Sequence, residues 1–384
     1  MKISADWLNK PSTRLVMERL VSGGYKAYFV GGCVRNTLLN IEATDIDIAT
    51  SAHPKKVLEI MENAGLKALP TGIEHGTVTV VANKKNYEVT TLREDIETDG
   101  RRAKVKFSKS ILEDAKRRDF SINAIYSEQD GTILDPLDGI ADIFEKRIKF
   151  IGDPYERIKE DYLRILRFFR FLALFGKEDE NHEIEIAALN DLRDGLDTIS
   201  AERKTGEIFK LFAAPNLKYS ILLMEKAKIS SKIFDAYDYK SLNNLKELED
   251  RLEVSPCATR RLAAYTKDNL KSQLRFSNKI TKAHKVLREE AIGKKDAAEL
   301  SYRYNEKIAL DSILVRSSLH STEPSKNVFH RIKLGSVAKF PVKSVDLAEY
   351  FSGPKLGKML AYLEQKWIES DFRLSKEVLI STIK

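Results

Sequence analysis

The most constraining feature of this 384-residue chain is a change from strand-like to helix-like patterning along its length. Short stretches at 25–34, 44–49, 76–82, 86–92 and 104–107 combine β-branched residues with polar–apolar alternation, which predicts strands. From about residue 154 onward, nearly every segment has helical spacing. Strands followed by helices favour an α+β fold, in which a head with a small mixed sheet and helices precedes an all-α remainder.

The length of the chain predicts two to four domains. We expect a charged, mobile loop at 93–103, where Gly100 interrupts the pattern. The expected divisions are an N-terminal helix at 1–24, a head at 25–150, a helical neck at 151–225, and a helical body and tail at 226–384.

Several classes of protein are disfavoured by composition. No apolar run approaches the ~20 residues of a transmembrane helix, and the N-terminus lacks the apolar core of a signal peptide. Only two cysteines occur, Cys33 and Cys257, so the sequence predicts no disulfide framework and a reducing, cytoplasmic location. We expect Cys33 to be a small buried residue rather than a reactive thiol.

The net charge of +8 is unevenly distributed. Residues 226–384 hold 31 Lys and Arg against 20 Asp and Glu, whereas residues 1–225 hold 34 against 37. A basic C-terminal region suggests a polyanionic partner, most simply a nucleic acid. The alternative is that these lysines only solvate helix surfaces.

Two carboxylates, Asp45 and Asp47, stand two residues apart in a predicted strand and therefore project to one face. Neighbouring carboxylates repel unless a cation lies between them, and their hard oxygens suit Mg²⁺. Just upstream, Gly31 and Gly32 can turn backbone N–H groups toward a phosphate. Together these features predict metal-dependent phosphoryl or nucleotidyl transfer, although an Asp-x-Asp pair alone is often a solvated strand end. Glu88, on a neighbouring predicted strand, is either a third carboxylate or an ordinary sheet-surface residue.

A second polar block runs from Arg117 to Asn123. Adjacent arginines opposite a metal site can hold a triphosphate, because guanidinium binds phosphate oxygens bidentately. Asn123 could contact a ribose hydroxyl. The alternative is a helix surface on which Asp119 pairs with the arginines.

A third block, 160–170, is predicted to be one continuous helix. Steps of three residues fall back about 60° around a helix, so Asp161, Arg164 and Arg167 share a face, while Arg170 lies about half a turn from Asp161. An interhelical ion-pair network would explain this stripe. Alternatively, these side chains could select a base. Cytosine and adenine each present an amine donor beside a ring-nitrogen acceptor, which an Asp acceptor beside an Arg donor would match. Guanine and uracil present an acceptor beside a donor and would be rejected. Further on, Ser200 is expected to cap a helix in which Arg203 pairs with Glu207.

The order of these blocks resembles the class II tRNA nucleotidyltransferases, the CCA-adding enzymes of the polymerase-beta-like nucleotidyltransferase superfamily. The resemblance covers roughly residues 25–210, and its motifs are Gly31-Gly32-x-Val34-Arg35, Asp45-x-Asp47, Arg117-Arg118-Asp119-Phe120 with Asn123-Ala124, Asp135-Pro136-x-x-Gly139, and Glu160-Asp161-x-x-Arg164. One departure is Asn36, which stands where the family usually has Asp, so an ion pair there is expected to be absent.

The resemblance implies a role for each block. Asp45 and Asp47 would bind two Mg²⁺ ions and be catalytic, and Asp161 with Arg164 would select the base. The nucleotide-binding set is expected to be Gly31, Gly32, Arg35, Arg117, Arg118, Asp119, Asn123, Asp161, Arg164, Arg167 and Arg170. A flexible loop linked to the switch from C to A addition would contain Arg93, Asp95, Asp99, Gly100, Arg101 and Arg102, and Asp135 to Gly139 would be a hinge.

The implied activity is addition of C, C and A to the 3′ end of tRNA from CTP and ATP, with pyrophosphate release. The expected partner is tRNA, and neither a membrane nor an obligate protein partner is implied. Alternatives are an enzyme that adds only the terminal A, a bacterial poly(A) polymerase, and an inactive RNA-binding module. The absence of a basic insertion between Asp47 and Thr71 favours CCA addition over poly(A) synthesis.

Overall fold

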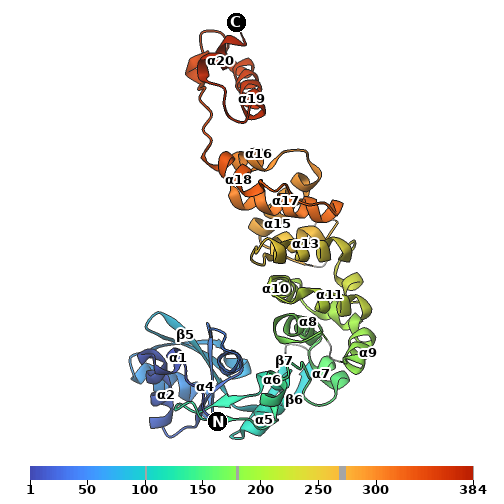
Figure 1. The fold of residues 1–384 in the computed structure, drawn as a ribbon. Coiled ribbons are helices and arrows are strands. Elements are labelled where there is room, and N and C mark those ends of the chain that lie inside the picture. The colour runs from blue at the N-terminus through green and yellow to red at the C-terminus, as the bar shows by residue number, and fades with distance from the viewer. Residues whose placement is uncertain (100–101, 179–180, 268–273, 384) are drawn as a thin grey trace. The chain divides into compact units, whose positions relative to one another are not determined.

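The computed structural model describes residues 1–99, 102–178, 181–267 and 274–383. The chain forms two compact units, Met1–Ile233 and Phe234–Lys384. An α+β N-terminal unit followed by helices confirms the predicted fold class (Figure 1). The finer expected boundaries at 24, 150 and 225 stay predictions.

A seven-stranded sheet organises the first unit, in the order β3-β4-β5-β2-β1-β8-β9. Only β2 and β5 run parallel, and the other neighbouring pairs are antiparallel, so the sheet is mixed as expected. Its strands are β1 (Ala27–Val30), β2 (Ile46–Thr50), β3 (Lys67–Gly72), β4 (Thr77–Ala82), β5 (Lys85–Thr91), β8 (Tyr126–Ser127) and β9 (Ile133–Leu134).

Helices α2 (Pro11–Ser22) and α4 (Pro54–Asn63) pack on each other and against this sheet, near the N-terminal, blue end of the ribbon (Figure 1). The single helix expected at 1–24 is wrong. It is divided into α1 (Asp6–Asn9) and α2, because Lys10 precedes a proline and adopts an extended backbone. Helix α3 (Gly32–Leu38) and the short 3₁₀ turn η1 (Ile73–His75) complete this part of the unit.

The prediction of a loop at 93–103 is also wrong. Its described residues form strands β6 (Arg93–Asp99) and β7 (Arg102–Phe107), which pair as a separate two-stranded antiparallel sheet. The register places Glu94 opposite Lys106, and their charged groups lie 3.8 Å apart. Opposite charges facing each other stabilise such a pair of strands. Gly100 and Arg101 lie outside the described residues.

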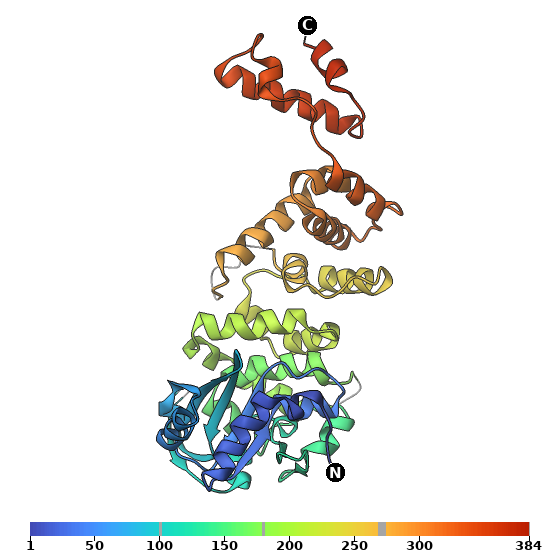
Figure 2. The same ribbon diagram turned by 90° about the vertical axis from the view of Figure 1, so that its left-hand side faces the viewer.

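From the sheet the chain continues through short elements into helices, as predicted beyond residue 154. Helices α8, α10 and α11 pack on one another, and they can be followed in green in Figures 1 and 2. The elements are α5 (Ile111–Lys116), η2 (Ser121–Asn123), α6 (Gly139–Phe144), α7 (Pro154–Glu160), α8 (Leu163–Phe175), α9 (Glu183–Asp191), η3 (Arg193–Thr198), α10 (Ala201–Ala213), α11 (Leu217–Lys226) and α12 (Ser230–Ile233).

An aromatic core joins the segment after α5 to helix α8. The Phe120 ring lies 4.7 Å from Phe150 and 5.3 Å from Phe171, and Phe150 stacks on Phe168 at 5.8 Å. Phe120, Phe150 and Phe168 are fully buried. Rings of this size dominate the burial energy of a core, so the polar residues beside Phe120 and those on α8 are held in fixed positions relative to each other.

The regular elements of the second unit are helices within its described residues, and one isolated β-bridge joins Tyr237 to Thr266. A buried charge cluster lies within it, where Arg260 and Arg261 both bind Glu249, and Arg260 also binds Asp311. Its elements are α13 (Tyr239–Arg251), α14 (Ala258–Tyr265), α15 (Asn278–Ile292), α16 (Ala297–Arg303), α17 (Glu306–His320), α18 (Val328–Val337), η4 (Ser344–Leu347), α19 (Gly353–Glu369) and α20 (Lys376–Ser381).

Candidate active site

The paired carboxylates lie at the start of the central strand β2. Ile46 and Ile48 are buried on the core side, as the alternation predicted, and Asp47 projects from the opposite face. Asp45 is exposed and immediately precedes the strand. The parallel register with β5 places Glu88 directly beside Asp47.

In this arrangement neighbouring carboxylates repel one another. Burial raises the pKa of Asp47 to about 6, and the carboxylates of Glu88 and Asp45 add to the rise while Arg118 opposes it. A divalent cation would relieve this repulsion, and oxygen ligands of this kind suit Mg²⁺. Within the described residues, no three acidic, His or Cys side chains are arranged to hold a metal ion. The two carboxylates of Asp45 and Asp47 are of the type that suits a divalent cation, and Glu88 as a ligand stays a prediction.

Gly31 joins β1 to α3 with a φ of +71°, a conformation that L-residues rarely adopt. A Cβ on Gly31 would lie 3.5 Å from the Arg118 guanidinium and 3.6 Å from the Asn123 carbonyl oxygen. The glycine turn therefore lies against the second polar block, 86 or more residues later in the chain. Cys33, in the first turn of α3, is buried, and burial raises the pKa of its thiol to about 12, which agrees with a packing role.

Arg35 is buried and held from several sides. Its guanidinium donates to Oδ1 of Asn36 from Nη2 at 2.8 Å and to Oδ1 of Asn123, and it lies 4.4 Å from the centre of the Phe175 ring. Burial lowers the pKa of Arg35 to about 10, although Asp119 opposes this. As expected, Asn36 makes no ion pair with Arg35, but its amide oxygen is a hydrogen-bond acceptor for it.

The adjacent arginines are both anchored by Asp114, which the sequence interpretation did not select. Asp114 is buried in α5 and accepts from Arg117 Nε at 2.8 Å, from Arg118 Nη2 at 3.0 Å, and from the Tyr126 hydroxyl at 2.6 Å. Burial alone would raise the pKa of Asp114, but Arg118 and Arg117 lower it to about 2. The i,i+3 and i,i+4 spacing of Asp114 to these arginines was the signal that could have identified it.

Asp119 connects the head segment to helix α8. Its Oδ1 accepts from Asn123 Nδ2 at 3.0 Å, and its Oδ2 accepts from Arg167 Nε at 2.7 Å. Burial opposes ionisation, but Arg167 and Asn123 hold the pKa of Asp119 well below its ordinary value. The hydrogen bond from Arg35 to Asn123 extends this network to the glycine turn. The expected alternative, in which Asp119 pairs with its adjacent arginines, is thus replaced by a pair with Arg167.

The continuous helix expected at 160–170 is wrong, because the chain breaks at Asp161 between α7 and α8. Asp161 has an extended backbone, with φ −154° and ψ 104°, and its Oδ1 accepts from the Leu163 N–H at 3.1 Å. Short acidic side chains of this kind compete with helix formation by bonding to nearby backbone. Asp161 therefore lies at a helix junction rather than in a helical stripe with Arg164.

Arg164 lies in the first turn of α8, just beyond that junction. Its Nη1 donates to Glu160 Oε2 at 2.6 Å and to the Arg157 carbonyl at 2.9 Å, and its Nη2 donates to the Arg117 carbonyl at 3.0 Å. A guanidinium has five N–H donors and a carboxylate has about four acceptor positions. Both Arg164 and Asp161 thus keep capacity for an additional partner.

The expected Arg203–Glu207 pair is not formed. Ser200 does cap α10, but Arg203 Nη2 donates to Asp161 Oδ2 at 2.7 Å, and Glu207 lies 2.9 Å from Arg170 Nε. Helix α10 therefore supplies a partner both to Asp161 at the junction and to Arg170 within α8. Only tertiary packing of α10 on α8 brings these groups together, and no local sequence signal indicates it.

The Asp135–Gly139 turn caps helix α6. Asp135 accepts from the N–H groups of Gly139 and Ile140, each at 2.9 Å. Gly139 is pressed against the backbone carbonyl of Ser121, so a Cβ there would collide with that oxygen. This geometry links the turn tightly to η2, and its role as a hinge stays a prediction.

Comparisons with known proteins identify the family of the chain. Residues 27–149 match the poly A polymerase head domain family. The mitochondrial CCA tRNA nucleotidyltransferase 1 of Mus musculus is 32% identical over 96% of this chain and 88% of its own length. The CCA-adding enzyme of Lactococcus lactis is 32% identical over 96% of each chain.

Two solved structures share the fold. The Bacillus stearothermophilus CCA-adding enzyme in complex with CTP has a TM-score of 0.71 and 27% identity, with 94% of each chain covered. The Thermotoga maritima CCA-adding enzyme complexed with tRNA has a TM-score of 0.69 at 18% identity, covering 100% of this chain and 99% of that one.

The head-domain match and these relatives show a nucleotidyltransferase, a class of transferase that generally uses a divalent metal. The chain belongs to the family of CCA-adding enzymes, also named CCA tRNA nucleotidyltransferases. Each helix in the described part of the chain is too short or too polar to cross a bilayer.

Proposed function

We propose that this protein adds C, C and A in turn to the 3′ end of tRNA, using CTP and ATP and releasing pyrophosphate. The observation that carries the proposal is a series of hydrogen bonds from Arg118 through Asn123 and Asp119 to Arg167 on α8. Arg118 lies beside the glycine turn, and its charge opposes the rise in the pKa of Asp47. Full-length similarity to CCA-adding enzymes supports the same activity.

Asp45 and Asp47 would hold two Mg²⁺ ions together with the phosphates of the nucleotide. When bound, such ions lower the pKa of the attacking hydroxyl and stabilise charge on the triphosphate. The chain's own contribution is positional. Arg118, fixed by Asp114, faces the glycine turn, where it can bind the triphosphate beside the carboxylates.

Base selection is proposed for Asp161 and Arg164. The Asp161 carboxylate would accept from the exocyclic amine of cytosine or adenine, and Arg164 would donate to the adjacent ring nitrogen. With guanine or uracil, donors would face donors and acceptors would face acceptors. Each buried group left without a hydrogen bond would cost about 1–3 kcal/mol of binding free energy. Arg203 and Glu160 hold the two side chains in place before a nucleotide binds.

The basic residues of 226–384 are proposed to bind the tRNA backbone through phosphates, without selecting sequence. We also propose that residues 93–102 act as a flexible loop in the switch from C to A addition, and that residues 135–139 act as a hinge. A two-stranded hairpin can still move as a body, so the observed strands are compatible with the first of these roles.

The decisive experiment offers tRNAs that end before C, after C and after CC, each with one labelled nucleotide. We expect CTP incorporation into the first two, a single ATP incorporation into the third, and neither GTP nor UTP incorporation. Continued A addition would instead indicate a poly(A) polymerase, and absence of C addition would indicate an A-only enzyme.

Asp47→Ala separates an enzyme from an inactive RNA-binding module. We expect this change to abolish incorporation while tRNA binding, measured by fluorescence anisotropy, stays within about twofold, since the proposed tRNA contacts lie elsewhere. Turnover that survives Asp47→Ala would show that the site is misassigned.

A further inference from the structure

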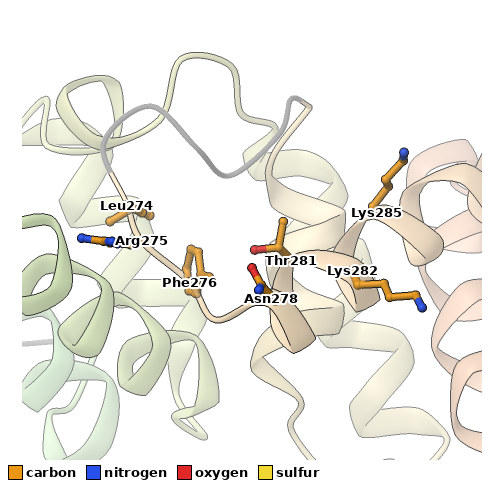
Figure 3. A pocket seen from close by; sticks show the side chains of 7 residues that line it. All are labelled: Leu274, Arg275, Phe276, Asn278, Thr281, Lys282 and Lys285. Atoms are coloured by element: carbon orange, nitrogen blue, oxygen red, sulfur yellow. The ribbon is translucent and has the colours of Figure 1, made fainter.

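A cavity of about 470 Å³ lies in the second unit, where the chain enters helix α15. Its lining includes Arg275 and Phe276 from the preceding segment and Asn278, Thr281, Lys282 and Lys285 from the first turns of the helix (Figure 3). The volume is within the range of small-molecule sites, about 300–1,000 Å³. It is large enough to accept one nucleotide.

The charged residues lining this cavity are all basic. Two other cavities are lined by both signs of charge: one has Lys10 with Asp6 and Glu42, and the other has Arg260 and Lys307 with Glu306 and Asp311. Among the described residues, the α15 cavity therefore differs in having basic side chains and no acidic one in its lining. This charge favours an anion.

The lysines of the cavity are weakly neutralised. Lys285 lies 3.7 Å from Glu289, and both side chains are more than 60% exposed, so the pair contributes little. Lys282 is exposed and has no ion pair within the described part of the chain. Two cationic groups on one side of the cavity can thus approach a phosphate.

The side chains are arranged in a row. Figure 3 shows Asn278 and Thr281 in the middle, with Phe276 beside them, Lys282 and Lys285 on one side, and Arg275 on the other. In a single RNA strand, each nucleoside has a phosphate on both sides. Proteins hold such strands with cations along the backbone and with aromatic side chains against the bases. A free nucleotide would place phosphate on one side only.

We infer that this cavity binds one nucleotide of the tRNA, with its flanking phosphates near Arg275 and near Lys282 and Lys285, and its base or sugar against Phe276. The inference rests on the proposed function and assigns a specific tRNA contact outside the active site. It adds a binding site that selects RNA by its backbone and does not take part in the reaction.

The test compares Lys282→Ala and Lys285→Ala with Lys279→Ala. Lys279 is an exposed lysine on the same helix that does not line the cavity, so its removal changes the net charge equally. The dissociation constant for tRNA is measured by fluorescence anisotropy at several salt concentrations. We expect each cavity variant to raise it about 3- to 10-fold and to reduce the salt slope by about one, with the control within about twofold.

Kinetic constants distinguish this inference from its alternatives. The KM for CTP and the kcat at saturating tRNA should be unchanged in all three variants. If Lys279→Ala weakened tRNA binding equally, the cavity would not be a specific site, and non-specific electrostatic attraction would explain the binding. A raised KM for CTP in the cavity variants would indicate that the cavity binds free nucleotide instead of tRNA. If the wild-type protein binds tRNA and adds CCA while the cavity variants behave as the control does, only this inference fails. A wild type that neither binds nor extends tRNA would refute the proposed function as well.

Discussion

Arg203 donates to the carboxylate of Asp161 at 2.7 Å, across 42 residues of sequence. The acidic group proposed to select the base is thereby held by helix α10, while its own backbone lies at the junction of α7 and α8. Both side chains are partly exposed, at 26% and 22%. Asp161 is therefore fixed in direction and still accessible to a nucleotide.

Arg203→Met should weaken base discrimination. Without its partner Asp161 can rotate, and a charge-assisted hydrogen bond contributes about 1.5–3 kcal/mol, so we expect about a 10- to 100-fold fall in the kcat/KM ratio of CTP to UTP. Lys210→Met, on the exposed face of α10, is the matched control. An unchanged ratio in Arg203→Met would mean that Arg203 only supports packing.

Asp114→Asn should impair nucleotide binding, although Asp114 is not itself proposed to contact the nucleotide. The change leaves Arg117 and Arg118 without their buried counter-charge, and loss of one buried partner costs about 3–5 kcal/mol of stability. We expect a lower Tm and at least about a tenfold rise in the KM for CTP. The neighbouring Glu113→Gln, on the surface of α5, should change neither quantity, and a normal KM in Asp114→Asn would contradict the anchoring role.

Gly139→Ala and Gly206→Ala should have opposite effects on stability. A methyl group at Gly139 collides with the Ser121 carbonyl, so we expect the free energy of unfolding to fall by about 1–3 kcal/mol. Gly206 lies within α10 with open space around it, and alanine there should stabilise by about 0.5–1 kcal/mol. Urea denaturation measures both. Equal effects would show that the turn at Gly139 relaxes around the methyl group.

Acid should destabilise the protein partly through His284. This side chain is buried and bonded to Thr266, and burial lowers its pKa from 6.5 to about 4. Between pH 4 and 6.5 the unfolded state binds more protons than the folded state. The contribution of His284 to the free energy of unfolding is therefore complete above pH 6.5, and it falls by at most about 3 kcal/mol as the pH falls to 4. His284→Gln should show a shallower loss over this range, whereas the exposed His320→Gln should follow the wild type.

The sequence predicted features that depend on local pattern. The alternation around Asp47 correctly indicated a strand with Ile46 and Ile48 buried, and the strand-then-helix order indicated the fold class. The pairing of β6 with β7 was missed, because acidic residues have low intrinsic strand propensity and the pairing of Glu94 with Lys106 is not a local signal. The helix break at Asp161 was missed because the flanking residues have continuous helical spacing.

Partners of the predicted site residues were harder to predict than the residues themselves. Asp114 pairs at helical spacing and could have been found. Arg203 and Glu207 could not, because their partners are set by how α10 packs on α8, and i,i+4 spacing favoured the wrong pair. Side-chain pairing across helices depends on tertiary packing, which a single sequence does not encode locally.

The clustered arginines around Arg35 would give the nucleotide a second role. Burial lowers the pKa of Arg35 and of Arg170, and repulsion from neighbouring arginines adds to this, although Asp119 and Glu207 oppose it. A triphosphate bound beside these arginines would relieve the repulsion, and a ligand that binds only the folded state raises stability. The substrate would thus also act as a counter-ion for the fold.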